Sequence, residues 1–209
     1  MTKKLNKSGQ VLGQKGNETR ARILEATDSL LRANRGVPPT LAALAREAGI
    51  TSPTFYLYFG DVGEAIEALV RMTGEKLDGL IALLDDPWSR EERFARSEVF
   101  VRAYFDYWKV NAPALRARNR LADQGDERFV KLRIAATSKL ISHLALQIGN
   151  PPVPGGLPCS PESTAAWLIT ALERQATVMV LKLYPSFSPD MDDSIRSMAN
   201  LFGAVIAGV

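Results

Sequence analysis

The stretch from residue 41 to residue 59, LAALAREAGITSPTFYLYF, constrains the fold more than any other part of the chain. Its first half has apolar residues at i, i+3, i+4 and i+7, which give a helix one apolar face: Leu41, Leu44, Ala45 and Ala48. Gly49 follows where a helix ends with a positive φ, which glycine adopts without a Cβ clash. The stretch therefore predicts two short helices joined by a sharp turn.

The second short helix is predicted to begin after Thr51, which is a good N-cap residue. Phe55 and Phe59 lie four residues apart and are expected to face the first helix. The outward side then carries hydroxyl, aromatic and small apolar groups: Ser52, Pro53, Thr54, Tyr56, Leu57 and Tyr58. Such a helix suits the DNA major groove, with hydroxyls on phosphates or base edges and apolar groups on thymine methyls. The alternative is that Tyr56 and Tyr58 are simply packed aromatic residues.

These residues resemble the N-terminal signature of the TetR family of bacterial repressors. The matching positions, within about residues 17–69, are Thr40, Ala45, Gly49-Ile50, Pro53-Thr54-Phe55-Tyr56 and Tyr58-Phe59. One departure is Val62-Gly63, where the family usually has a lysine that touches a phosphate. The outward residues and the resemblance together give the expected DNA contacts: Lys15, Arg20, Thr40, Thr51, Ser52, Pro53, Thr54, Tyr56, Leu57 and Tyr58.

The distribution of charge fits a DNA-binding head on a body that does not bind DNA. Residues 1–60 hold nine Lys and Arg against four Asp and Glu, whereas the whole chain has 26 against 23. The first quarter is therefore basic and the remainder slightly acidic. We divide the chain into a flexible basic arm (1–16), a helix-turn-helix DNA-binding domain (17–60) and a helical ligand-binding and dimerisation domain (61–209). The arm is either a disordered leader or a source of extra phosphate contacts, and both can hold.

The patterns beyond the first sixty residues predict an all-α fold of about nine helices and no strands. Asp61 and Glu64 form a capping box for a fourth helix, and Ser89 and Glu92 form one for a fifth that ends near Val110. Pro113 is expected to separate it from a short basic helix at 114–122. Two later helices are predicted to start at Ser160-Pro161 and at Ser188-Pro189.

The body is rich in aromatic residues, which favours an apolar pocket for a small hydrophobic effector. The expected lining is Phe100, Tyr104, Phe105, Trp108, Trp167, Glu173 and Arg174. For any single aromatic residue, ordinary core packing is the alternative. Glu173 and Arg174 are charges in a mostly apolar helix, and they fit an ion pair, an interface edge or a polar end of the pocket. The short stretch Leu172-Glu173-Arg174 also resembles the group of mycobacterial repressors that control ethionamide activation.

The last two predicted helices have apolar stripes that suit a homodimer, as in the family that the chain resembles. On the final helix these residues recur at steps of four and three from Met191. The predicted interface consists of Trp167, Ile195, Met198, Phe202 and Val205. The alternative is that both stripes are buried within one subunit.

No pattern predicts catalysis, a metal or a cofactor. His143 has no second histidine or carboxylate at metal-ligand spacing, and Cys159 lies in a proline-rich loop without a recognisable base. A single cysteine and the absence of a secretory signal favour a reducing cytoplasm, and no run approaches 18 apolar residues, so no membrane span is expected.

We therefore predict a non-enzymatic, ligand-responsive transcriptional regulator. The expected partners are a double-stranded palindromic DNA operator, a small hydrophobic effector that releases the repressor from it, and a second copy of the chain. One alternative is a helical small-molecule-binding protein or enzyme with a regulator-like N-terminus, which the basic head opposes. Another is an architectural DNA protein without an effector, which the body of about 150 residues opposes.

Overall fold

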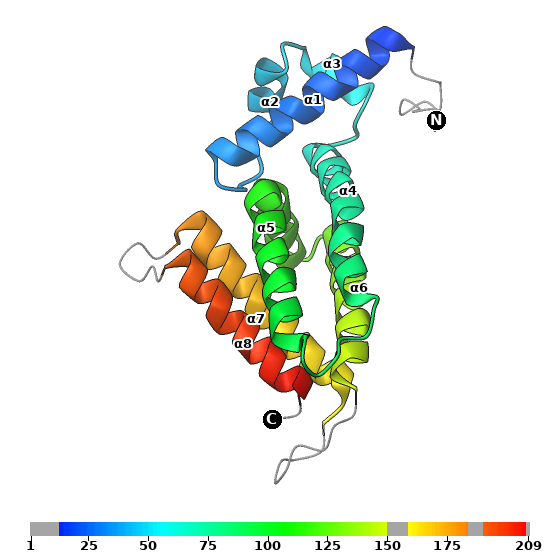
Figure 1. The fold of residues 1–209 in the computed structure, drawn as a ribbon. Coiled ribbons are helices and arrows are strands. Elements are labelled where there is room, and N and C mark those ends of the chain that lie inside the picture. Colours follow the sequence, from blue (N-terminus) through cyan, green and yellow to red (C-terminus); the bar gives the residue numbers. More distant parts are fainter. Residues whose placement is uncertain (1–12, 150–158, 184–189, 208–209) are drawn as a thin grey trace. The chain divides into compact units, whose positions relative to one another are not determined.

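A computed structural model describes residues 13–149, 159–183 and 190–207. These residues form α-helices and one short 3-10 helix, and no strand occurs among them, which confirms the all-α prediction. The elements, labelled in Figure 1, are α1 (Gln14–Ala33), α2 (Leu41–Glu47), α3 (Ser52–Tyr56), α4 (Val62–Ile81), η1 (Ala82–Leu84), α5 (Arg93–Asp123), α6 (Glu127–Ile148), α7 (Pro161–Leu181) and α8 (Met191–Ala207).

The predicted break at Pro113 is wrong, because α5 continues through this proline to Asp123. Proline inside a helix costs about 3 kcal/mol, since it removes one hydrogen bond and crowds the preceding turn. Ala112, Ala114 and Leu115 beside it are at most 5% exposed. Burial on both sides of Pro113 thus holds the helical course, and the two helices predicted here are one.

Other predicted helix starts are confirmed by their capping contacts. The Ser89 hydroxyl accepts a hydrogen bond from the Glu92 amide at 3.3 Å, just before α5. The Ser160 hydroxyl accepts one from the Ser163 amide at 3.1 Å, at the start of α7. The predicted start at Ser188-Pro189 lies outside the described residues, as does most of the predicted arm; α8 is capped instead by Asp190, whose carboxylate accepts from the Asp193 amide at 2.9 Å.

The chain divides into two compact units. The first contains the described residues up to Thr73 together with Pro113–Arg133, and the second contains Gly74–Ala112 and the described residues from Ile134 onward. Helices α4, α5 and α6 each contribute one end to each unit. The first unit thus joins the helix-turn-helix to the end of α5 and the start of α6.

The first unit has two buried clusters. One lies among α1, α2, α3 and the start of α4: Ile23, Leu24, Ala26, Leu44, Ala48, Phe55, Phe59 and Ala65. The other brings α5 and α6 against α1 and α4: Leu31, Ile66, Val70, Ala114, Ala117, Ala122 and Phe129. Because α1 and α4 contribute to both clusters, the short helices α2 and α3 rest on a core that extends well beyond them.

The second unit is built around aromatic residues of α5. Phe100, Tyr104 and Trp108 are at most 3% exposed, and the Phe100 ring lies 5.9 Å from that of Phe202 on α8. Helices α7 and α8 run beside each other as an antiparallel pair (Figure 1). Gln147 on α6 donates hydrogen bonds to the carbonyl oxygens of Leu84 (2.6 Å) and Asp86 (3.1 Å), which fixes the connection between η1 and α5.

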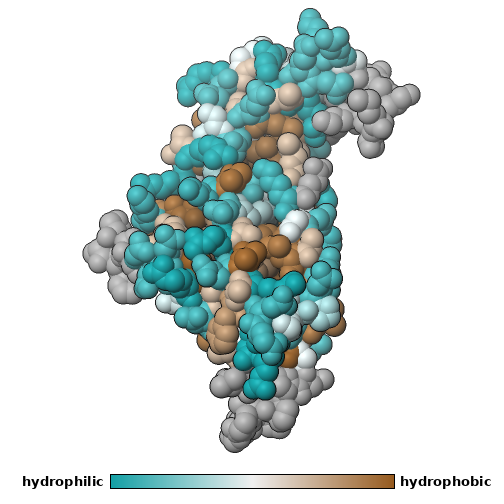
Figure 2. Space-filling model, viewed as in Figure 1, coloured by the Kyte–Doolittle hydropathy of each residue, from teal (hydrophilic) through white to brown (hydrophobic). Residues whose placement is uncertain are grey.

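The face displayed in Figure 2 is mostly hydrophilic, and hydrophobic residues are exposed on it in separate patches. None of the helices, in so far as their residues are described, is long and apolar enough to cross a membrane.

Two glycines with positive φ make a matched test of the packing in the first unit. Gly36 has φ +77°, and a Cβ added there would lie 2.7 Å from Cβ of Arg116, whereas Gly49 has φ +62° and open space. We predict that Gly49→Ala lowers the free energy of unfolding by about 1–2 kcal/mol, from backbone strain alone. Gly36→Ala should cost about 1–3 kcal/mol more, because Arg116 must move. Urea denaturation measures both, and equal losses would contradict the contact.

Candidate nucleic-acid interface

Local hydrogen bonds build the turn between α2 and α3 as predicted. The Thr40 hydroxyl accepts from the Ala43 amide at 3.2 Å and caps α2. At the other end, the Gly49 amide donates to the Arg46 carbonyl (3.2 Å) and the Ile50 amide donates to the Ala45 carbonyl (3.0 Å). This pair of bonds with a glycine at positive φ is the Schellman ending of a helix. The chain therefore reverses sharply at Gly49, and α3 follows at once.

Helix α3 is oriented by its two phenylalanines. Phe55 and Phe59 are 0% and 1% exposed, and their rings lie 5.8 Å apart in the cluster that α1 and α2 share. Thr51 caps the helix, since its hydroxyl accepts from the Thr54 amide at 3.3 Å. The buried face of α3 is thus fixed by packing, and the opposite face is free for a partner.

The predicted contact residues of α3 differ in exposure. Tyr56 and Leu57 are 49% and 59% exposed. Pro53 is also exposed, while Ser52 and Tyr58 are half-buried and Tyr58 packs against the core. The Thr54 hydroxyl lies 2.9 Å from that of Thr51, so part of its hydrogen-bonding capacity is used locally. Tyr56 and Leu57 are the most prominent groups on this face.

The predicted cations lie on α1. Lys15 is exposed in the first turn. The Arg20 guanidinium lies 5.0 Å from the centre of the Phe59 ring, where a cation–π contact holds it beside the end of α3. Arg46, near the end of α2, is a further exposed cation that was not among the predicted DNA contacts. Its place in the last turn of a short helix beside Gly49 was the available signal.

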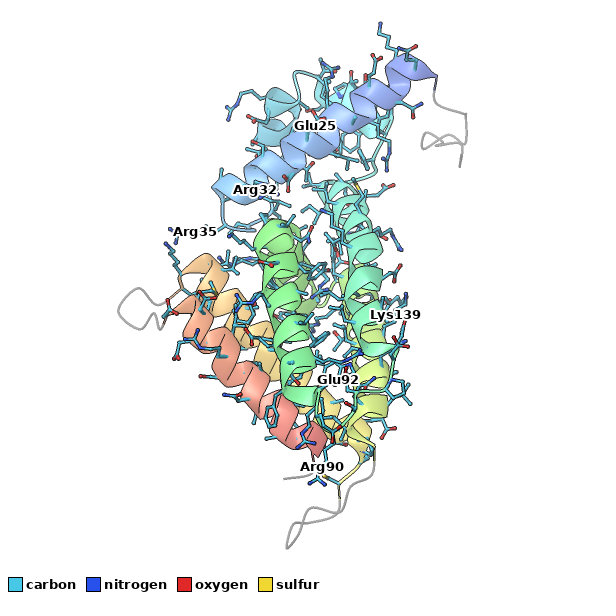
Figure 3. All side chains as sticks on the ribbon, in the orientation of Figure 1. Glu25, Arg32, Arg35, Arg90, Glu92 and Lys139 are labelled. Atoms are coloured by element: carbon cyan, nitrogen blue, oxygen red, sulfur yellow. The ribbon has the colours of Figure 1, made fainter. Side chains whose placement is uncertain are left out.

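Charged side chains also surround the far end of α1. Glu25 and Arg32 lie on α1 and Arg35 lies just past its end (Figure 3). Arg32 is paired with Asp28 at 2.7 Å. The Ser29 hydroxyl donates to the Glu47 carboxylate at 3.1 Å and links α1 to α2.

A pocket of about 300 Å³ lies in the second unit between α5, the end of α7 and the start of α8. Its lining is Arg102, Phe105, Asp106, Lys109, Met179, Val180, Lys182, Met191, Asp192 and Ile195. Phe105, Met179 and Ile195 are at most 6% exposed and form an apolar floor. Arg102 on the rim is held by Asp192 at 2.8 Å and by Glu98 at 3.0 Å. Hydrogen bonds from Arg102 keep the pKa of the Asp192 carboxyl below its usual range.

The structure brings one predicted ligand residue, Phe105, into this pocket. Phe100, Tyr104 and Trp108 lie in the core of the second unit, whereas Trp167 is 76% exposed on α7. Glu173 is half-buried and Arg174 is exposed. The rim residues Arg102 and Asp106 and the lining residues at the end of α7 were not among the predicted ligand contacts.

The predicted dimer residues also fall into buried and exposed groups. Ile195 and Phe202 are 4% and 0% exposed within one chain, so they have no surface left to lose in a dimer. Met198 and Val205 are half-buried. Trp167 on α7 and Leu201 on α8 are large apolar side chains that are 76% and 47% exposed, and Met191 at the start of α8 is also exposed. Leu201 lies next to the predicted Phe202 and was not among the predicted interface residues.

The side chains of His143 and Cys159 have ordinary local contacts. The His143 ring lies 2.8 Å from the Lys139 carbonyl oxygen at Nδ1 and 3.5 Å from Asp85 at Nε2. The Cys159 thiol is exposed and lies 3.5 Å from the Thr164 hydroxyl. Among the described residues, no group of three or more His, Cys, Asp and Glu side chains could hold a metal ion.

No protein-family model matches the chain. The chain is 25% identical over 157 residues to the nucleoid occlusion factor SlmA from Marinomonas sp. (strain MWYL1), covering 71% of this chain and 79% of that protein. The fatty acid degradation regulator FadR from Bacillus halodurans has a similar structure, with a TM-score of 0.64, 13% identity and coverage of 93% and 97%. A TetR-like transcriptional regulator from Rhodococcus sp. RHA1 gives a TM-score of 0.61, 17% identity and coverage of 93% and 96%.

The exposed hydroxyl of Tyr56 makes the interface testable. Tyr56→Phe keeps the ring but removes a hydrogen-bond donor, so DNA binding should weaken several-fold, in line with about 1 kcal/mol for a neutral hydrogen bond. The measurement is a gel-retardation titration, at fixed salt, on a duplex enriched from a random library by the wild-type protein. Tyr107→Phe, the same change in the second unit, is the control. Equal affinities for all three proteins would remove Tyr56 from the interface.

The two structural likenesses cover nearly the whole length of this chain and of the solved structures. They agree with the order of short and long helices and with the packing of α1, α2 and α3 described above. The chain therefore has the fold of the TetR-like transcriptional regulators.

Proposed function

We propose that this protein is a homodimeric, ligand-responsive regulator of transcription, which binds a palindromic DNA operator and is released by a small hydrophobic molecule. The exposed face of α3, opposite the buried Phe55 and Phe59, is the observation that carries this proposal. The structural relatives support it, since the Rhodococcus protein is named a TetR-like transcriptional regulator and the Bacillus protein a fatty acid degradation regulator. No catalytic step is part of the proposal.

Helix α3 would enter the major groove with Tyr56 and Leu57 foremost. Leu57 and Pro53 suit thymine methyl groups, and the Tyr56 hydroxyl suits a phosphate or a base edge. Lys15, Arg20 and Arg46 would supply charge to the backbone on either side. Because α3 contains no Arg, Asn or Gln, bidentate reading of bases would come from outside this helix.

A dimer is proposed because one α3 cannot span a two-fold operator. Two such helices must lie about one DNA turn apart, roughly 34–36 Å, to reach successive major grooves. The exposed Trp167 on α7 and Leu201 on α8 supply large apolar groups for a symmetric interface. Ile195 and Phe202 would support this surface from beneath.

A charge on α7 tests the dimer. Trp167→Glu should shift the protein to a monomer, because the interface would bury an unpaired carboxylate. Leu146→Glu is the matched control, since Leu146 is 78% exposed on α6 and should leave the assembly unchanged. Light scattering at micromolar concentration gives the mass. A Trp167→Glu dimer with normal DNA affinity would rule out this surface as the interface.

The pocket between α5, α7 and α8 is the proposed effector site. Its apolar floor suits a hydrocarbon chain, and its charged rim suits a polar end group. Lys182 on the rim has φ 48° and ψ 50°, a left-handed conformation that costs a non-glycine residue about 1–2 kcal/mol. An effector releases DNA only to the extent that it binds the DNA-free form of the protein more tightly than the DNA-binding form.

Filling the pocket tests the effector site. Met179→Trp should block the binding of ten-carbon alkyl probes with different polar ends, here decanoate, decan-1-ol and decylamine, that bind the wild type. In the wild type, a probe coupled to release should weaken DNA binding by about 5–150-fold. Isothermal titration follows the probe and gel retardation follows the DNA. Unchanged probe binding by Met179→Trp, or no binding of any probe to the wild type at millimolar concentration, would exclude the pocket.

A further inference from the structure

One arginine joins the first turns of two helices in the first unit. Asp61 caps α4, since its carboxylate accepts from the Glu64 amide at 2.7 Å. Asp126 caps α6, since its carboxylate accepts from the Arg128 amide at 3.1 Å. The Arg128 guanidinium contacts both carboxylates, with Nη1 at 3.0 Å from Oδ1 of Asp61 and Nη2 at 2.8 Å from Oδ2 of Asp126. The two N-caps are thus bridged by a single side chain.

The geometry of this bridge depends on the planar guanidinium. Nε and Nη2 form two parallel bonds to Asp126, at 3.1 and 2.8 Å, and Nη1 remains for Asp61. An ammonium group lacks this fixed fork and would not hold both carboxylates in the same geometry. The Phe129 ring, which is buried, lies 5.8 Å from the guanidinium carbon and backs it from the core.

Gly63 provides the space for the bridge. A Cβ at this position would lie 2.6 Å from Nη2 of Arg128 and 3.0 Å from Oδ1 of Asp61. Any side chain there would force the guanidinium to shift, because its Nη2, which binds Asp126, lies closest to the added Cβ. Helices disfavour glycine, and the space needed by the Arg128 guanidinium explains why one occurs in the first turn of α4.

The bridge acts on the segment that leaves α3. Helix α3 ends at Tyr56, and Phe59 is buried three residues later. The Gly60 amide then donates to the Glu64 carboxylate at 2.5 Å, and Asp61 follows directly. Little free chain remains between α3 and the Arg128 bridge, so displacement of Asp61 would be transmitted to the exit of α3.

The charges favour a persistent bridge. Hydrogen bonds from Arg128 hold the pKa of the Asp126 carboxyl below its usual range. A carboxyl with a lowered pKa in the folded protein stabilises the fold above its ordinary pKa, and this stabilisation is lost as the pH falls through the lowered value. The contact between Arg128 and Asp126 is therefore intact at neutral pH and weakens in acid.

We propose that Arg128 is a positioning residue for DNA binding, whose guanidinium joins the N-caps of α4 and α6 and so fixes the orientation of α3. This inference rests on the proposed DNA-binding function. Arg128 does not touch DNA in this role, and it acts through Asp61 and the turn that follows α3.

The test uses full-length protein and two duplexes of equal length, one enriched from a random library by the wild type and one of unrelated sequence. Arg128→Lys keeps the charge but loses the fork, and Gly63→Ala keeps both charges but displaces the guanidinium. Each should lower affinity for the enriched duplex about ten-fold and for the unrelated duplex less than about two-fold. Arg71→Lys is the control, because Arg71 pairs with Glu67 within α4, away from the bridge.

The double variant Gly63→Ala with Arg128→Lys separates positioning from general destabilisation. If Gly63 serves only to admit the guanidinium, the second change should add less than about two-fold to the loss. The inference would be overturned if the affinity loss of the double variant equalled the product of the two single losses, or if the losses were equal on both duplexes. A lower urea midpoint without any change in DNA affinity would also overturn it. If the wild type enriches no duplex, the proposed function itself fails, and that outcome is distinct from variants that bind as well as the wild type.

Discussion

The helix-turn-helix of this chain depends on apolar packing that its own short helices cannot supply. Helix α2 has 7 residues and α3 has 5, far below the length at which an isolated helix is stable in water. They persist because Phe55 and Phe59 are buried against α1 and the start of α4. A second cluster around Leu31, Ile66 and Phe129 then holds α1 and α4 themselves. The presentation of α3 to a partner is therefore a property of the whole first unit.

Polar contacts set the exact starts of the helices that this apolar packing holds together. Caps at Thr40, Thr51 and Asp61 begin three successive helices, and each uses one short side chain to satisfy a free amide. Such bonds set where a helix starts more sharply than burial does, because an apolar face tolerates a small slide along the helix. The Arg128 bridge extends this control from one helix start to two. It combines local capping with a contact between segments 67 residues apart in the sequence.

The features that were predictable from the sequence are those determined by neighbouring residues. Gly49 at positive φ, the Thr51 cap and the Asp61–Glu64 capping box each follow from residue types within four positions. The course of α5 through Pro113 was not predictable, since it depends on burial by distant segments. The role of Gly63 was hidden for the same reason. Its neighbour Arg128 is remote in sequence. From the sequence alone, Val62-Gly63 was notable only because the resembled family usually has a lysine there.

Apolar stripes specify a structure less closely than helix caps do, because a stripe indicates that a helix face is buried but not which segment buries it. Ile195 and Phe202 fit a dimer or the core of one chain equally well, and the structure buries both within the chain. Trp167 and Leu201, by contrast, are exposed within one chain, so a second copy would still have apolar surface to cover there.

The division into two units gives α5 a particular place in any response to a ligand. Of the three helices that line the pocket, α7 and α8 belong to the second unit, while α5 continues into the first. Its pocket residues Arg102, Phe105 and Lys109 precede Pro113, and Ala114 and Ala117 after it lie in the core beneath α1 and α4. The proline has no amide hydrogen for the preceding turn, so a change of helix direction costs less there than elsewhere along α5. In the proposed response, a shift of α5 at the pocket would be carried along this helix to its turn at Pro113.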